Sequence, residues 1–396
     1  MRVSIAFLVA GYVLSQFYRA CLAVLAPVLG VEIGATPGDL AVSLGLWYIS
    51  FAAMQIPVGI ALDRIGPRLT VGVLLGVGGA GGAVVFALAG GPLAVHLGMV
   101  LIGVGCAPVL MGAYYIFARS FSPAVFGTAA GAVMGAGSLG NLAGAAPLAW
   151  MIETVGWRET LWALAVVTAL VAAAILRFTQ DPERIERSDA NRGSFWGLLR
   201  IPGLWVILPL TLVNYSVVAG LRGLWVGPFL AEVHGADTIL IGRVALAMGV
   251  AMVAGNFIYG PTDRLLGSHK RAVIGGNLIL AVVLAVLWAA PGAGILQITL
   301  LMAGVGLFGA SYPAVMAHGR TFFPNHSVGR GVSLLNMFSI GGVAILQFAS
   351  RPVYEHAIAM GNASDAFATL FMFFLVPLLI GLGFYVFSRD GAAHFR

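Results

Sequence analysis

The sequence predicts an all-α integral membrane protein with twelve transmembrane helices, arranged as two pseudo-symmetric bundles of six. Three observations predict this class: an apolar composition, a series of twelve apolar runs, and an internal repeat. Of the 396 residues, 60% are hydrophobic and 9% are charged, whereas soluble domains contain about 45–50% apolar and about 25% charged residues. With a mean hydropathy of +0.98, the chain is expected in a lipid bilayer.

The composition also excludes several kinds of partner. The formal charge is +6, but the basic residues are scattered over short loops, which does not indicate a nucleic-acid partner. Cys21 and Cys106 both lie in apolar segments, so we expect no disulfide, metal site or redox chemistry. We also expect no cofactor.

The first apolar run continues well past the apolar core of a signal peptide, which predicts a retained helix.

Twelve apolar runs are bounded by charges, turn residues or Gly/Pro clusters, and each is long enough to cross a bilayer core of about 30 Å. The predicted spans are 4–29, 40–62, 69–90, 93–118, 125–150, 159–178, 202–231, 239–262, 271–290, 294–318, 328–352 and 366–387. The longest polar interruption, residues 179–201, predicts a cytoplasmic linker. It separates an N-terminal bundle, residues 1–178, from a C-terminal bundle, residues 202–396.

The basic residues predict the orientation of the spans. With the N-terminus inside, 16 Lys and Arg residues fall on the cytoplasmic side and 3 on the outer side. By the positive-inside rule, both termini are therefore expected in the cytoplasm. We expect a multi-pass monomer in a bacterial-type inner (cytoplasmic) membrane.

The two halves of the chain resemble each other at an offset of about 200 residues. The matched pairs are Asp63 and Arg64 with Asp263 and Arg264, Arg119 with Arg320, and Tyr12 and Arg19 with Tyr215 and Arg222. A colinear series of this kind predicts repeated six-helix halves. That architecture is typical of alternating-access transporters, whose substrate binds near the bilayer midplane between the halves.

The residues after the second span resemble the loop signature of the major facilitator superfamily. In GIALDRIGPRLT, residues 59–70, the signature positions are Gly59, Asp63, Arg64, Gly66 and Arg68. GWRETLW, residues 156–162, is also similar to a segment that the family has between spans five and six. The resemblance covers essentially the whole chain, and it implies a transporter with no enzymatic activity.

The resemblance also implies a role for the charges of this loop and of its repeat. Asp63, Arg64, Arg68, Asp263 and Arg264 would belong to a cytoplasmic latch between the halves, which opens and closes during alternating access. A simpler interpretation is that these charges follow the positive-inside rule and cap helix ends. Both interpretations can hold together.

Two departures from the family pattern weaken a drug-efflux interpretation. Met99 stands where proton-coupled members usually have an Arg, four residues before a Gly-x-Gly. The glycine-rich fifth span lacks the Gly-Pro pair of drug antiporters. Its glycines at 131, 135, 140 and 144 are expected first of all to pack closely against other helices.

Arg19 and Arg222 are the two basic residues predicted inside the membrane. A mid-bilayer Arg costs roughly 3 kcal/mol on insertion scales, and its planar fork suits a carboxylate or phosphate. All fifteen Asp and Glu residues map to loops or span ends. Each Arg could pair with an internal acid or backbone carbonyls, but we favour an anionic substrate. Paired arginines on helices one and seven also resemble the family's organophosphate/phosphate exchangers.

Neighbouring polar residues are further candidates for substrate contact. Tyr12 and Tyr215 each precede their Arg by seven residues, or about two helical turns, and could donate a hydrogen bond to the same anion or anchor at a helix interface. Gln16 shares the face of Arg19. Gln55 and Asn256 are a repeat-related amide pair, for which hydrogen bonding between helices is the alternative.

His318, near the inner end of the tenth span, is a candidate for proton coupling, although a solvated histidine at a helix end is the interpretation we favour. The expected function is secondary active transport of a small organic anion of carboxylate or phosphate type, as an exchanger or a proton-linked symporter. Protons or a counter-anion would then be the coupled partner. The alternative is efflux of amphiphilic drugs or metabolites by proton antiport. No metal spacing, nucleophile motif or phosphate loop supports a catalytic role.

Overall fold

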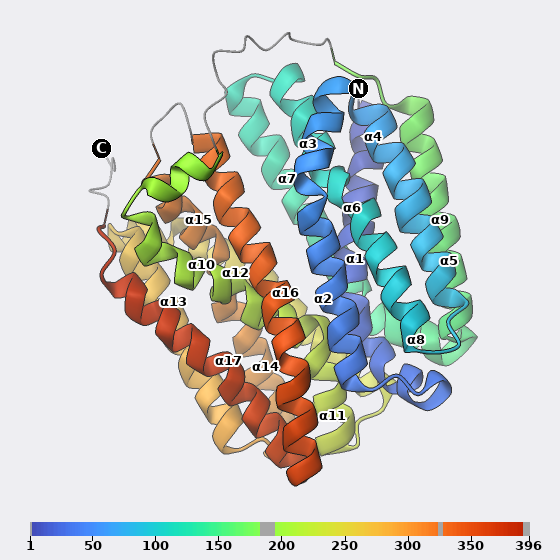
Figure 1. Ribbon diagram of the computed structural model, residues 1–396, viewed down its shortest axis with the longest axis vertical. Coiled ribbons are helices and arrows are strands. Elements are labelled where there is room, and N and C mark those ends of the chain that lie inside the picture. The colour runs from blue at the N-terminus through green and yellow to red at the C-terminus, as the bar shows by residue number, and fades with distance from the viewer. Residues whose placement is uncertain (1, 183–194, 324–327, 391–396) are drawn as a thin grey trace. The chain divides into compact units, whose positions relative to one another are not determined.

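The computed structural model describes residues 2–182, 195–323 and 328–390. In these residues the secondary structure is helical and no strand occurs (Figure 1). Within the described ranges, eleven helical stretches are long and apolar enough to cross a membrane. The all-helical, multi-pass class is therefore confirmed, whereas the count of twelve and the cytoplasmic termini remain predictions.

The chain divides into two compact units. One comprises Met1–Glu186 with Ala236–Arg243, and the other Arg187–Gly235 with Val244–Arg396. The predicted linker, residues 179–201, falls largely on positions 183–194, which lie outside the described residues. The boundaries predicted at 178 and 202 therefore remain predictions.

The N-terminal unit is built from the helices labelled α1 to α9 in Figure 1. They are α1 (Arg2–Ile33), α2 (Pro37–Ala53), α3 (Gln55–Arg64), α4 (Pro67–Leu74), α5 (Gly81–Ala87), α6 (Pro92–Ser120), α7 (Pro123–Ala143), α8 (Ala146–Val155) and α9 (Trp157–Phe178). A π-helical segment, Leu75–Ala80, joins α4 to α5. Four helices begin with a proline, whose missing N–H costs nothing in the first turn.

The predicted fifth span, 125–150, is divided between α7 and α8. The helices separate at Gly144 and Ala145, where Ala145 adopts φ −111° and ψ −113°. The second span likewise consists of α2 and α3, which meet at Met54. Several predicted spans are thus composite, because a short turn interrupts the helix without ending the apolar run.

The C-terminal unit contains the helices α10 to α17. They are α10 (Leu204–Gly220), α11 (Val226–His234), α12 (Thr238–Leu266), α13 (His269–Ala289), α14 (Ile295–Gly309), α15 (Tyr312–Arg320), α16 (Val328–Met360) and α17 (Ala363–Val386). A 3₁₀ segment, Phe195–Arg200, precedes α10, and a π-helical turn, Leu221–Trp225, joins α10 to α11.

Glycines bring equivalent helix pairs into backbone contact in the two units. A Cβ at Gly140 of α7 would overlap the carbonyl of Val13 in α1, and one at Gly342 of α16 would overlap the carbonyl of Leu212 in α10. Without a Cβ, the helix backbones can touch, which is how transmembrane helices gain packing energy in lipid.

The close-packing prediction for the fifth span is right for part of the glycine series. Gly140 and Gly144 both lie against α1, where a Cβ at Gly144 would come within 3.1 Å of the Phe17 carbonyl oxygen. At Gly131 and Gly135 the prediction is wrong, because a Cβ there meets nothing within 4 Å. At 100° per residue, Gly131 and Gly135 lie on the opposite face of the helix from Gly140 and Gly144, and it is the second face that packs against α1.

Substitution of Gly140 by Ala is expected to destabilise the protein, because the new methyl group meets the backbone of α1 instead of a side chain that can move. Overpacking of this kind typically costs about 1–3 kcal/mol. The measurement is the melting temperature of the purified protein in detergent. Gly131→Ala in the same helix is the control and should leave the melting temperature unchanged or raise it. Equal melting temperatures for both variants would contradict the close contact.

Candidate functional site

Arg19 lies near the middle of α1, within the membrane-spanning stretch Val3–Ile33. Its side chain is buried, with 7% of the residue exposed. The guanidinium carbon lies 4.8 Å from the ring centroid of Trp47 and 4.8 Å from that of Phe51, both on α2. A cation above aromatic rings is stabilised by their quadrupoles, and more strongly when it is shielded from water.

The two rings beside Arg19 form a stacked pair. Their centroids are 5.1 Å apart with an interplanar angle of 16°, as expected for residues one helical turn apart on α2. Gly103 of α6 packs closely against α2, because a Cβ at Gly103 would come within 2.5 Å of the Trp47 carbonyl oxygen. The aromatic pair is therefore held on a helix with little freedom to shift.

Tyr12 and Gln16, which lie about two turns and one turn before Arg19, form a polar contact. The Gln16 amide donates to the Tyr12 hydroxyl at 2.9 Å, and this hydroxyl donates to the sulfur of Met134 on α7 at 3.4 Å. Gly137 gives the Tyr12 ring its space, since a Cβ there would overlap the ring. The structure thus brings two of the predicted residues, Tyr12 and Gln16, into direct contact.

The repeat-related amides behave differently from each other. Gln55, at the start of α3, is half-buried and donates to the carbonyl of Phe51 at 3.3 Å. Asn256, on α12, is exposed. The first contact links Gln55 to the aromatic pair beside Arg19, whereas the described contacts assign no such link to Asn256.

Arg222 lies in the π-helical turn between α10 and α11, near the middle of the spanning stretch Leu204–His234. The residue is 4% exposed. Arg19, by contrast, lies in regular α-helix. The two repeat-related arginines therefore share burial but differ in local backbone geometry. π turns are rare, and they occur frequently at functional sites.

Polar and aromatic residues of the C-terminal unit surround the π-helical turn that contains Arg222. Trp225 donates to Gln347 and to Ser350 of α16, at 3.2 Å each. Tyr354, one turn beyond Ser350, donates to the carboxylate of Glu232. Separate hydrogen bonds at Trp225 and Glu232 thus link the segment that carries Arg222 to α16.

Tyr215, the predicted partner of Arg222, is half-buried. Its ring centroid lies 5.3 Å from that of Tyr312 on α15, and the Tyr312 hydroxyl donates to Asn336 of α16 at 2.7 Å. Tyr12 in the N-terminal unit is 3% exposed. The two tyrosines of the repeat are therefore not equivalent in burial.

The signature loop after α3 is tied to the end of α9. Asp181 accepts a hydrogen bond from the backbone N–H of Arg68 at 2.8 Å, in the first turn of α4. The Arg68 side chain donates to the Leu176 carbonyl at 2.7 Å. Gly66 has φ +102°, and a Cβ there would overlap the Asp181 carboxylate. Only glycine combines this backbone conformation with this contact.

The remaining predicted latch residues differ in their contacts and in whether the structure describes their side chains. Asp63 forms an ion pair with Arg119 of α6 at 3.9 Å, and the Arg119 guanidinium carbon lies 3.7 Å from the centroid of the Tyr115 ring. Arg64 is exposed at the end of α3. Asp263 and Arg264 belong to α12, but their side chains lie outside the described residues.

His318 is fully buried, so the interpretation of a solvated histidine at a helix end is wrong. Its Nε2 lies 3.0 Å from the carbonyl oxygen of Arg389, and its Nδ1 lies 2.5 Å from the hydroxyl of Tyr385. Because a carbonyl only accepts, Nε2 carries the proton; in the neutral ring Nδ1 then accepts from Tyr385. The imidazole joins α15 to α17 and the segment that follows it.

Several residues of the site were not predicted from the sequence. Trp47 and Phe51 carry a signal, namely an aromatic pair four residues apart in an apolar span. Gln347 carries one also, as an amide inside the eleventh span. A separate buried network of hydrogen bonds of 2.8–3.3 Å joins Asn214 of α10, Asn277 of α13 and Ser311 in the turn before α15.

Comparisons with known proteins agree with this architecture. The solved structure of the D-xylose-proton symporter matches with a TM-score of 0.79 at 14% identity, covering 98% of each chain. A bacterial homologue of the human lysosomal transporter Spinster, inward-facing and occupied, matches with a TM-score of 0.73 at 19% identity, covering 97% of this chain and 96% of that one. At these identities the likeness establishes the fold alone.

Sequence comparison identifies the family. An uncharacterized transporter of Bacillus subtilis, YybO, is 26% identical over 188 residues, which cover 45% of this chain and 42% of that protein. The match thus spans less than half of the relative's length. The model of the Major Facilitator Superfamily matches residues 8–347, and the chain therefore belongs to the Major Facilitator Superfamily.

Proposed function

We propose that this protein carries a small organic anion, of carboxylate or phosphate type, across the inner membrane by alternating access. As a member of the Major Facilitator Superfamily it is a secondary transporter of a small molecule and not an enzyme. The proposal concerns the charge of the substrate, and it rests on the burial of Arg19 and Arg222.

These two arginines are permanent cations near the middle of membrane-spanning stretches, 7% and 4% exposed. Arg remains protonated at any working pH, so its charge cannot be removed to lower the cost of burial. In the described part of the chain, every Asp and Glu lies in a loop or within two helical turns of a helix end. A charged residue inside the membrane is by default a candidate for a functional site.

The contacts of Arg19 are compatible with anion binding. Trp47 and Phe51 interact with the guanidinium as aromatic rings, whereas a carboxylate or phosphate is bound through the N–H groups at the guanidinium edge. Aromatic support and anion binding can therefore act on the same side chain. Tyr12 and Gln16 lie on the same helix and supply a hydroxyl and an amide as neutral hydrogen-bond donors.

For the coupling, we favour exchange or symport of a protonated substrate over a relay of buried carboxylates. An exchanger needs no titrating side chain, because the returning anion neutralises the arginines again. Proton coupling through His318 is the second possibility. Both ring nitrogens of His318 are engaged with Tyr385 and Arg389, so proton uptake at Nδ1 would require the Tyr385 hydroxyl to turn from donor to acceptor.

For the conformational cycle, we propose that Asp63, Arg64, Arg68, Asp263 and Arg264 form a cytoplasmic latch. Support comes from the first half of the set, where the loop is anchored to α6 through Arg119 and to the end of α9 through Asp181. An anchored loop keeps its charges in fixed positions, as a latch requires. Efflux of amphiphilic compounds by proton antiport remains the alternative function.

The proposal predicts that Arg19→Ala and Arg222→Ala each abolish uptake of the anion while the protein still folds. Removing a buried charged partner costs about 2–5 kcal/mol of binding, so uptake at low substrate concentration should fall at least about 30-fold. Arg19→Lys and Arg222→Lys should rescue poorly, because an ammonium lacks the bidentate fork. The measurement is initial uptake in proteoliposomes, normalised to folded protein by gel filtration.

Arg351→Ala is the matched control. Arg351 forms an exposed ion pair with Glu355 near the end of α16, and its loss should leave uptake near the parent value. Normal uptake by Arg19→Ala or Arg222→Ala would remove that arginine from the site.

A second prediction concerns His318→Asn. If exchange is the mechanism, counterflow should keep its rate and its pH profile, whereas the melting temperature should fall. Leaving buried hydrogen-bond partners unsatisfied costs about 1–3 kcal/mol. Counterflow and pH-driven uptake are compared in the same proteoliposomes. Loss of pH-driven uptake with normal counterflow would instead identify His318 as the proton carrier.

A further inference from the structure

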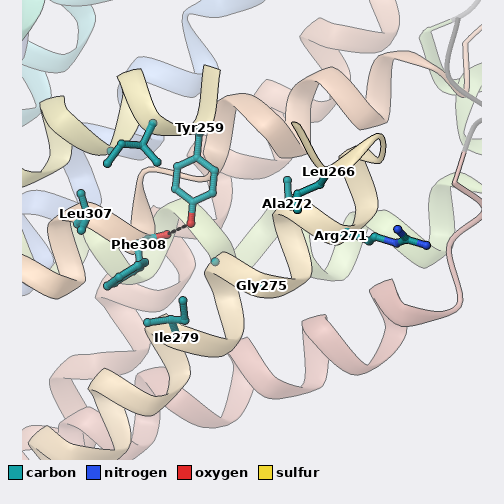
Figure 2. Close-up of a pocket in the computed structure, with 11 residues that line it drawn as sticks. Tyr259, Leu266, Arg271, Ala272, Gly275, Ile279, Leu307 and Phe308 are labelled. Carbon is teal, nitrogen blue, oxygen red and sulfur yellow. Dashed lines mark hydrogen bonds between the residues drawn. The ribbon is translucent and has the colours of Figure 1, made fainter. Parts of the chain in front are cut away.

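An apolar groove lies on the C-terminal unit, between α12, α13 and α14. The groove is open on one side and has a volume of about 230 Å³. Figure 2 shows Tyr259, Leu307 and Phe308 gathered at one end, with Gly275 and Ile279 of α13 beside them and Arg271 extending away at the other end. From Arg271 to Ile279 the groove follows α13 for about 12 Å, at 1.5 Å per residue.

Glycines shape the floor of this groove. A Cβ at Gly276 would overlap the Tyr259 hydroxyl, and one at Gly255 would overlap the carbonyl of Leu307, so these two glycines draw the three helices together. Gly275 is different, because it is exposed and a Cβ there meets nothing within 4 Å. The groove exists at this point because the wall residue has no side chain.

The groove faces outward along membrane-spanning helices. Ile258, Leu266 and Ile279 are exposed apolar residues of its lining, and α12 and α13 both belong to stretches that can cross a membrane. The surface of such a helix meets lipid, and an apolar channel along it fits an acyl chain. The transported substrate of the proposed function is an anion and does not suit these walls.

Arg271 gives the groove a charged end. It lies in the first turn of α13 and is exposed. None of the ion pairs among the described residues involves it. The preceding residue, Lys270, turns toward α17 and donates to the carbonyl of Ser388 at 2.8 Å, and Asp390 accepts from Ser268. Among the described residues that line the groove, Arg271 thus supplies the cation.

From this arrangement we propose that the groove binds an anionic phospholipid, with one acyl chain along α13 and the phosphate at Arg271. The basic residues place the start of α13 on the predicted cytoplasmic side, where anionic lipids attract juxtamembrane Lys and Arg. A helix N-terminus adds a favourable field for a phosphate. Apolar walls and one terminal cation match the two parts of such a lipid.

The test is native mass spectrometry of the full-length protein, released from detergent after incubation with phosphatidylglycerol or with phosphatidylcholine of the same chains. The parent protein should retain phosphatidylglycerol in preference. Arg271→Gln should lower its retention about five-fold, the contribution expected for one basic residue near a lipid surface, and should leave phosphatidylcholine unchanged. Gly275→Leu should lower retention of both lipids, because the leucine fills the groove without a clash.

Two control variants test whether lipid retention depends on this groove and not on any exposed arginine or glycine. Arg320→Gln removes an exposed arginine at the end of α15, and Gly383→Leu adds a side chain at an exposed glycine of α17 that has no neighbour within 4 Å. Both should retain phosphatidylglycerol as the parent does. Equal retention of the two lipids by the parent, or unchanged retention in Arg271→Gln and Gly275→Leu, would overturn the proposal. Anion uptake is not part of the readout, so its outcome is independent of the proposed function.

Discussion

The burial of two permanent cations inside apolar helices is the constraint to which the rest of the site responds. A guanidinium cannot lose its proton to escape a low dielectric, so the protein must supply compensating contacts. In the N-terminal unit these include the stacked rings of Trp47 and Phe51. In the C-terminal unit the backbone itself departs from α-helix at Arg222. The presence of such costly residues at two repeat-related positions is understandable if each has a role in binding an anion.

Close backbone packing explains how the helices around these arginines keep their positions. Gly140 and Gly342 bring α7 onto α1 and α16 onto α10, and Gly103 holds α6 against the carbonyl of Trp47. Contacts between backbones cannot be relaxed by a rotamer change, so each helix pair is a rigid unit. Transporters that alternate access by moving one bundle against another require this internal rigidity.

The sequence alone was sufficient for the helical membrane class, the family and the internal repeat, because hydropathy and colinear motifs persist without any tertiary contact. It also identified Arg19 and Arg222 as buried charges. Which residues contact Arg19, and which polar residues elsewhere are buried, depends on helix rotation and depth, and a one-dimensional pattern does not contain these. Trp47, Gln347 and the burial of His318 were therefore missed, as was the absence of a neighbour at Gly131. The π turn at Arg222 likewise leaves no signature in residue spacing.

Whether the substrate is an anion is best measured by counterflow in proteoliposomes, because counterflow reports substrate exchange without assuming a coupling ion. The panel should compare monocarboxylates, dicarboxylates, phosphate esters and larger chelators at two pH values, beside cationic and neutral amphiphiles. We expect the parent protein to exchange at least one class of small anion, and Arg19→Ala and Arg222→Ala not to exchange it. Exchange of only the cationic or neutral amphiphiles would contradict this expectation and would favour the efflux function.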